Sequence, residues 1–229
     1  RAEVRSQLGV ERDPLGSPLA LGTPELGSAI AKHYRDYYGL SVAAERIIVT
    51  TGSSAGFLLA FLAAFDAGDR VALGEPAYPA YRNILKAVNL DPAMIVTELA
   101  ARFQPTPTEI NAQAPDARGV LVASPANPTG TMLGEAEMKA LVDDCAAKGR
   151  WLIVDEIYHG ITYHGRAQSV LALTDQAIVI NSFSKYFSMT GWRLGWMVVP
   201  EILLRPIECL MQNLYISSPG ISQVAGVAA

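Results

Sequence analysis

The sequence predicts an α/β fold, namely a doubly wound, mostly parallel sheet flanked by helices. Two observations lead to this prediction. Apolar, β-rich runs alternate with helical segments along most of the 229 residues. The runs are apolar on both faces, which is typical of parallel strands covered by helices on each side. Half of the residues are hydrophobic, so a single large domain with a deep core is expected.

The predicted strands are short runs of aliphatic and β-branched residues that end at turn-forming or polar residues. In chain order they span residues 47–51, 70–73, 93–96, 119–123, 151–154, 177–180 and 194–199. Helices are predicted in the intervals, over residues 55–65, from the turn 74–76 to about 88, at 108–112, from 134 or 135 to 148, and from Pro200 to about 214. Gly149 supplies a C-terminal stop for the helix before it.

Composition excludes several classes of function. A net charge of −4 provides no basic field for nucleic acid. No apolar stretch approaches the ~20 residues that a membrane span needs, and the polar N-terminus does not resemble a signal peptide. Cys145 and Cys209 fall in predicted helices without the spacing of a disulfide framework. Reduced thiols of this kind indicate a cytoplasmic protein.

The three histidines do not have the spacing of a metal site. His159 and His164 flank a short loop, and His33 stands far from both. Because no cysteine or carboxylate set accompanies them, we expect packing or loop roles and no metal.

Polar residues follow four of the predicted strands directly. They are Gly52-Ser53-Ser54, Asn127, Asp155-Glu156 and Ser182 to Lys185. In open parallel sheets, ligands bind beyond the carboxyl ends of the strands, and these ends share one edge. The sequence therefore predicts a ligand site at that edge.

Taken singly, most of these residues have an ordinary structural explanation. Gly52, Ser53 and Ser54 join a strand to a helix, which makes either an anion site or a plain turn with a helix cap. Tyr78 follows the next strand and could stack on a flat ring or pack in the core. Asn127 precedes Pro128, and it could either start a turn or donate a hydrogen bond to a ligand.

Asp155 ends an apolar run, where a carboxylate is costly unless it is paired or caps a helix. Paired with a pyridinium nitrogen, it would keep that nitrogen protonated, and Tyr158 could reach the phenolic oxygen of the same ring. Lys185 is preceded by an apolar strand and serines. We expect a buried amine here, in contrast to the usual surface lysine, and burial beside other cations would make it nucleophilic.

The last group completes a recognisable set. Ser182, Ser184 and Arg193 could hold a phosphate, the arginine in bidentate fashion, although Arg193 could equally bridge to a structural carboxylate. A lysine that forms an imine, a carboxylate for a ring nitrogen and an arginine for a phosphate are what pyridoxal 5'-phosphate chemistry requires.

The motifs in this order resemble the class I/II aminotransferases of the fold type I pyridoxal phosphate enzymes. The resemblance begins at Gly22-Thr23-Pro24-Glu25-Leu26 and ends at Ile216-Ser217-Ser218-Pro219, so it covers nearly the whole chain. It implies a large cofactor-binding domain over residues 35–229, preceded by an incomplete N-terminal arm at residues 1–34. It also implies transfer of an amino group between an amino acid and a 2-oxo acid.

The resemblance implies a role for each site residue. Lys185 would form the aldimine and carry the proton, Asp155 would pair with the ring nitrogen, and Tyr78 would stack on the ring. Asn127 and Tyr158 would bind the ring oxygen. The phosphate would be held by the residues of the two turns and the arginine, namely Gly52, Ser53, Ser54, Ser182, Ser184 and Arg193.

Two departures from the family pattern stand out. Members usually continue into a small C-terminal domain that carries the arginine for the substrate carboxylate, and the resemblance implies that this domain is missing after Ala229. Ser17 stands where the family often has a tyrosine that reaches the partner subunit. The amino donor is therefore open among aromatic, branched and small aliphatic amino acids.

Other functions remain compatible with the same residues. A C–S lyase or a decarboxylase of fold type I would use the same lysine, aspartate and arginine. A non-catalytic, pyridoxal phosphate-binding regulatory module is a further alternative, disfavoured by the lack of a basic helix-turn-helix segment. Another phosphorylated ligand is disfavoured by the lack of a glycine-rich nucleotide motif. The resemblance also implies a homodimer, with the helix after Pro200 and the segment 215–220 near the partner.

Overall fold

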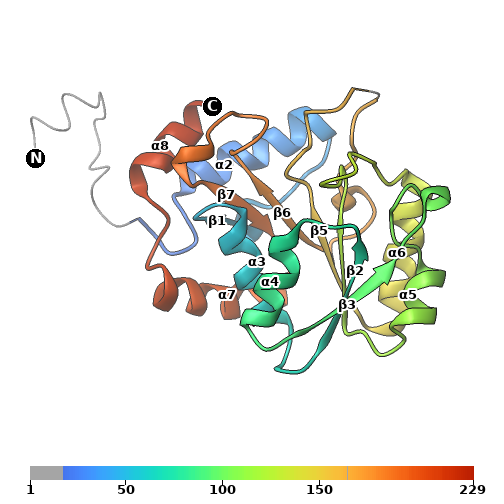
Figure 1. Ribbon diagram of the computed structural model, residues 1–229. Coiled ribbons are helices and arrows are strands. Elements are labelled where there is room, and N and C mark those ends of the chain that lie inside the picture. Colours follow the sequence, from blue (N-terminus) through green and yellow to red (C-terminus); the bar gives the residue numbers. More distant parts are fainter. Residues whose placement is uncertain (1–17, 164) are drawn as a thin grey trace, which may run out of the picture.

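A seven-stranded mixed sheet forms the centre of the molecule (Figure 1). The computed structural model describes residues 18–163 and 165–229, so Ser17 and His164 lie outside the described residues. The strand order is β1-β7-β6-β5-β4-β2-β3. The strands are β1 (Ile47–Thr50), β2 (Arg70–Glu75), β3 (Asp91–Val96), β4 (Gly119–Ala123), β5 (Trp151–Asp155), β6 (Ile178–Ser182) and β7 (Gly195–Val198).

All seven predicted strands are present, and the prediction of a mostly parallel sheet is confirmed. Only β7 runs against its neighbours, pairing antiparallel with β1 and β6. The other paired strands are parallel. Because β7 lies between β1 and β6, those two strands point the same way, and the carboxyl ends of β1, β4, β5 and β6 share one edge.

Helices cover both faces of the sheet (Figure 1). One face carries α3 (Ser53–Ala64), α4 (Pro79–Ala87) and α7 (Glu201–Leu214). The other carries α2 (Pro24–His33), α5 (Pro107–Gln113), α6 (Glu135–Lys148) and α8 (Gly220–Ala228). Short turns of helix complete the order: a π-helix η1 (Tyr34–Tyr38) and the 3-10 helices η2 (Ala44–Arg46), η3 (Leu99–Ala101), η4 (Val170–Ala172) and η5 (Thr190–Trp192).

The strands bury side chains alternately on the two faces, as the pleat of a sheet requires. In β4, Val120 and Val122 join the core under α5 and α6, whereas Leu121 joins the core under α3 and α4. The same alternation runs through β1, β5, β6 and β7. This two-sided burial explains why the strands are continuous apolar runs in the sequence.

Within the described residues, the first and last helices, α2 and α8, were not predicted from the sequence. Leu26 and Ile30 of α2 are buried in the main core, and α2 packs beside α8. A hydrogen bond also links the two helices, because the Thr23 N–H, just before α2, donates to Gln223 Oε1 of α8 at 2.8 Å.

The domain boundary predicted near residue 34 stays a prediction. The two cysteines are free thiols in α6 and α7, and no described helix is long and apolar enough to span a membrane.

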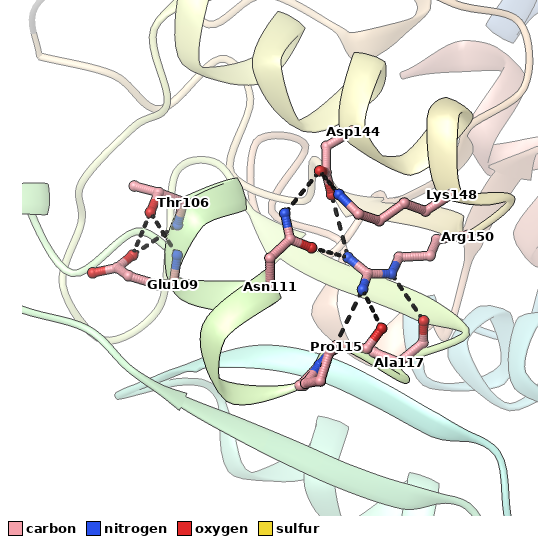
Figure 2. A network of polar contacts seen from close by, with 9 residues as sticks. Thr106, Glu109, Asn111, Pro115, Ala117, Asp144, Lys148 and Arg150 are labelled. Atoms are coloured by element: carbon pink, nitrogen blue, oxygen red, sulfur yellow. Dashed lines mark hydrogen bonds and ion pairs between the residues drawn. The ribbon is translucent and has the colours of Figure 1, made fainter.

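A buried arginine fastens the sheet edge opposite the polar strand ends (Figure 2). Arg150, just before β5, donates to the carbonyl oxygens of Ala117 and Pro115 at 2.9 and 2.8 Å. Its guanidinium also donates to Asn111 of α5 at 2.8 Å and contacts Asp144 of α6 at 3.2 Å. One side chain thus ties the amino ends of β4 and β5 to two covering helices. Figure 2 also shows the capping pair Thr106 and Glu109 that begins α5.

We expect Arg150→Met to lower the free energy of unfolding by about 3 kcal/mol, because it leaves buried acceptors without a donor. The matched control is Arg102→Met, since Arg102 pairs with Glu137 at an exposed position. That change should cost less than about 1 kcal/mol. Urea unfolding of both variants measures the difference, and equal losses would contradict this account of the network.

Candidate active site

The polar strand ends meet in a cavity of about 210 Å³ at the carboxyl edge of the sheet. Its wall comes from the ends of β1, β4, β5 and β6 together with α4 and η5. The lining residues are Ser53, Ser54, Phe57, Tyr78, Ala80, Tyr81, Asn127, Asp155, Ile157, Tyr158, Ser184, Lys185, Thr190 and Arg193. Nine of the eleven residues predicted from the sequence are in this wall, and Gly52 and Ser182 lie behind it.

At one end of the cavity, the turn from β1 to α3 and the arginine form a cradle for an anion. Gly52 has φ 78° and ψ 168°, a conformation that favours glycine. A Cβ atom on Gly52 would lie 2.5 Å from Arg193 Nη2, so the guanidinium rests directly on this backbone. The backbone N–H groups at the start of α3, Ser53, Ser54 and the guanidinium together favour a phosphate.

The loop after β6 supports this cradle from behind. Ser184 lines the cavity, and its N–H donates to Ser182 Oγ at 3.0 Å. Ser182 is buried, and its hydroxyl lies 3.0 Å from the Leu194 carbonyl oxygen. Thr190 Oγ1 donates to the Ser184 carbonyl at 2.9 Å, and Arg193 Nη1 donates to the Thr190 carbonyl at 3.1 Å. The serines and the arginine are therefore held by one hydrogen-bonded loop.

At the other end of the cavity, Asp155 is a buried carboxylate with 3% exposure. Oδ1 accepts from the Ile157 N–H at 3.0 Å, and Oδ2 accepts a short hydrogen bond from the Tyr81 hydroxyl. Burial raises the pKa of Asp155 to about 6, although both hydrogen bonds act to lower it. Among the described residues no ion pair includes Asp155. A cationic ligand group would supply the missing partner.

Tyr81 was missed in the sequence. It lies one helical turn after Tyr78, on α4, and its ring packs against Phe57 at a centroid distance of 4.9 Å. Burial, followed by the nearby Asp155, raises the pKa of its hydroxyl well above the ordinary value. Tyr81 therefore stays a neutral donor. The i, i+3 spacing of the two tyrosines was the available signal.

Lys185 and Asn127 lie between the two ends. Asn127 Nδ2 is 3.4 Å from the Tyr158 hydroxyl, and Lys185 Nζ is 5.7 Å from the centre of the Tyr158 ring. The expectation of a buried amine is wrong for this chain, because Lys185 is exposed. Lys185 thus lines the cavity and is also open to solvent in the described structure. Tyr78 is also partly open, at 42% exposure.

Size alone does not select this site. A larger cavity, of about 420 Å³, lies between α2, α8 and the segment 183–187. Its wall contains neither Asp155, Lys185 nor Arg193. The smaller cavity brings an amine, a carboxylate and a guanidinium together. In the described part of the chain no cluster of His, Cys, Asp and Glu could hold a metal ion.

Comparisons with known proteins identify the family to which this chain is similar. The family model of class I and II aminotransferases matches residues 11–229. A valine–pyruvate aminotransferase of Mycobacterium tuberculosis is 50% identical over 217 residues, which cover 94% of this chain and 56% of that protein. A (5-formylfuran-3-yl)methyl phosphate transaminase of Methanocaldococcus jannaschii is 33% identical over 211 residues, or 91% of this chain and 54% of that protein.

Solved structures give the same result. A crystal structure of an aminotransferase from Mycobacterium tuberculosis has a TM-score of 0.93 and 48% identity, and the match covers 100% of this chain and 58% of that one. Aspartate aminotransferase from Thermus thermophilus with maleate has a TM-score of 0.90 and 27% identity, covering 99% of this chain and 59% of that one. The chain spans about half the length of the curated relatives it matches.

We expect Tyr81→Phe to raise the pKa of Asp155 further in the cofactor-free protein, because the hydroxyl donates to the charged carboxylate. A carboxyl whose folded pKa exceeds its unfolded value costs stability as the pH rises through the folded pKa. The variant should therefore lose stability over a pH range that extends above 6, further than the wild type does. Thermal unfolding between pH 4 and 8 measures this. Tyr78→Phe is the control, and identical pH profiles for Tyr81→Phe and wild type would contradict the assignment.

Proposed function

This chain belongs to the class I and II aminotransferases, and we propose that it transfers an amino group between an amino acid and a 2-oxo acid with pyridoxal 5'-phosphate as cofactor. The observation that carries the proposal is the single cavity shared by Lys185, Asp155 and Arg193. Relatives whose names state aminotransferase activity support it. We also propose a cytoplasmic location, which the two free thiols support.

The residues of the cavity fit this cofactor from end to end. Its phosphate fits the cradle of Gly52, Ser53, Ser54 and Arg193, where a Cβ on the glycine would displace the guanidinium. Its ring nitrogen fits Asp155, the buried carboxylate that lacks a cationic partner among the described residues. When bound, pyridoxal phosphate supplies an aldehyde carbon and a ring that accepts electrons from the substrate carbon.

The side chains would divide the remaining work. Asp155 would hold a proton on the ring nitrogen, and Tyr81 would hold Asp155 by its short hydrogen bond. Asn127 and Tyr158 would donate to the ring oxygen, and Tyr78 would cover the ring. Ser184 would bind the phosphate, while Ser182 would support it from behind.

Among the described residues, Lys185 is the only lysine in the cavity wall. Its Nζ would act as the base that takes the proton from the α-carbon of a bound amino acid, and then as the acid that gives this proton back. Because Lys185 is exposed in this chain, we propose that further protein or the substrate covers the amine during the reaction. Relatives about twice as long as this chain support that proposal.

The first test is Lys185→Ala in the purified protein, with Lys139→Ala as the control on the exposed surface of α6. We expect the alanine variant at 185 to lose covalent attachment of the cofactor, detected by borohydride reduction and mass spectrometry. Its turnover should fall by roughly 10³-fold or more, while the control keeps wild-type values. Product analysis should find a 2-oxo acid and a new amino acid. Ammonia with pyruvate, or carbon dioxide with an amine, would overturn transamination, and binding without turnover would indicate a regulatory module.

The second test concerns the phosphate cradle. Gly52→Ala should weaken binding of pyridoxal phosphate by about 2 kcal/mol, roughly thirtyfold, because the new Cβ displaces Arg193. Binding of pyridoxal, which has no phosphate, should change much less. Gly39→Ala is the matched control, since Gly39 has φ 72° with open space around it. Equal loss of affinity for both ligands would contradict the placement of the phosphate.

We further propose a homodimer. Apolar side chains are exposed along one side of α8 at i, i+3 and i+6, with Ile221 at 37%, Val224 at 42% and Val227 at 44% exposure. Ile216, in the segment predicted to meet a partner, is 65% exposed. An apolar surface of this kind is typical of a subunit interface. Light scattering should give twice the monomer mass, and a fully active monomer would contradict the proposal.

A further inference from the structure

A second buried polar cluster lies behind the cavity, and the proposed function does not use it. It is formed by Glu156, His159 and Tyr38, of which Glu156 is fully buried and His159 is 6% exposed. Glu156 follows Asp155 directly, and successive side chains at a strand end point to opposite sides. Asp155 therefore reaches the cavity, whereas Glu156 reaches this cluster.

The hydrogen bonds of His159 fix the position of its proton. Nε2 lies 2.9 Å from the carbonyl oxygen of Ser124, which can only accept, so Nε2 carries the hydrogen. Nδ1 lies 2.7 Å from the Tyr38 hydroxyl. Because burial lowers the pKa of His159 to about 4, the ring is neutral at neutral pH. Nδ1 therefore accepts its hydrogen bond from Tyr38.

Glu156 does not compete for the histidine proton. Its Oε1 accepts from Ser169 Oγ and from the Val170 N–H, both at 2.9 Å. Oε2 has no hydrogen-bond partner in the described structure and lies 3.7 Å from His159 Nδ1. Burial raises the pKa of Glu156 to about 8, so the carboxyl is mostly protonated and uncharged at neutral pH. The cluster thus stays electrically neutral.

The histidine bond acts on the loop that carries Asn127. The Ser124 N–H donates to the Asp155 carbonyl at 3.1 Å, and Ser124 Oγ accepts from the Leu133 N–H at 3.0 Å. The bond from His159 to the Ser124 carbonyl completes the attachment of this residue. Ser124 opens the loop, and Asn127 lies three residues further on, in the cavity wall. Tyr158, which Asn127 contacts, is the neighbour of His159 in the chain.

We propose that His159 is a positioning residue, which accepts from Tyr38, donates to Ser124 and thereby sets Asn127 and Tyr158 at the distance needed to bind the ring oxygen of the cofactor. The inference rests on the proposed function. It assigns a purpose to η1, because this turn of π-helix carries Tyr38 and π-helical turns often occur at functional sites. An apolar side chain would fill the same space, but it would leave Ser124 without its donor.

A matched pair of variants tests the proposal. In His159→Gln, the side-chain amide nitrogen can occupy the place of Nε2 and donate to Ser124. In His159→Asn, the shorter side chain reaches only the place of Nδ1, so it can accept from Tyr38 but cannot donate to Ser124. Both changes replace the ring by an amide. Each variant keeps one of the two hydrogen bonds of His159: Gln keeps the bond to Ser124, on which the positioning of Asn127 depends, and Asn keeps the bond from Tyr38.

The readout is the pH midpoint of the visible absorption of the cofactor bound at Lys185, in the purified full-length protein. Asn127 would donate to the deprotonated ring oxygen and would therefore lower this midpoint. His159→Asn should raise it by about one pH unit, a tenfold change in the protonation constant. His159→Gln should stay close to wild type. In an Asn127→Ala background, the shift caused by His159→Asn should be smaller than in the wild type, because part of the effect acts through Asn127.

Each outcome decides the matter. Equal midpoints for the two variants, or additive shifts with Asn127→Ala, would overturn the positioning role. If the variants do not fold, nitrogen NMR of the histidine-labelled wild type still tests it. The proposal requires hydrogen on Nε2 and none on Nδ1 between pH 6 and 8, and the opposite tautomer contradicts it. A wild type without cofactor absorption would instead overturn the proposed function, and this inference with it.

Discussion

The rest of the site depends on a carboxylate that is buried without a cationic partner among the described residues. Asp155 ends β5 in the middle of the sheet, where burial raises its pKa to about 6. Two donors, the Ile157 N–H and the Tyr81 hydroxyl, stabilise the charged form without neutralising it. The free protein therefore holds a site whose energetic cost is recovered only when a cation arrives. A protonated ring nitrogen is such a cation, and it would be bound most strongly in the state that the chemistry needs.

The topology explains why the other groups meet this carboxylate. β1, β4 and β6 end at the same edge as β5, so the turn at Gly52, the loop of Asn127 and the loop of Lys185 reach one cavity. The reversed strand β7 completes the arrangement, because it begins at this edge and so brings Arg193 to the cradle. Behind the edge, His159 ties the Asn127 loop to the end of β5. The hydrogen-bond network of Arg150 lies at the opposite edge, so the residues that stabilise the sheet there are distinct from those that line the cavity.

Much of the fold and the site could be predicted because local patterns determine them. Continuous apolar runs predicted the strands, and the polar motifs near their ends predicted nine of the fourteen residues that line the cavity. Tertiary contacts determine the rest. Tyr81 looks like a core tyrosine until Asp155 is placed beside it, and His159 like a loop histidine until its two partners are known. The antiparallel direction of β7 depends on its pairing with β1 and β6, and the sequence of β7 by itself does not reveal these partners. Whether Lys185 is exposed depends on what covers the cavity. The apolar strand before Lys185, from which burial was predicted, carries no information about that cover.

The central claim, that Asp155 keeps the ring nitrogen protonated, can be measured directly with pyridoxal phosphate labelled with ¹⁵N in the ring. In the holoprotein, the nitrogen chemical shift should be that of a protonated pyridinium from pH 6 to pH 9. Asp155→Asn, which keeps the shape but not the charge, should give the shift of a neutral ring at the upper end of this range. A neutral ring nitrogen in the wild type at pH 7, or a pyridinium unchanged by Asp155→Asn, would contradict the account.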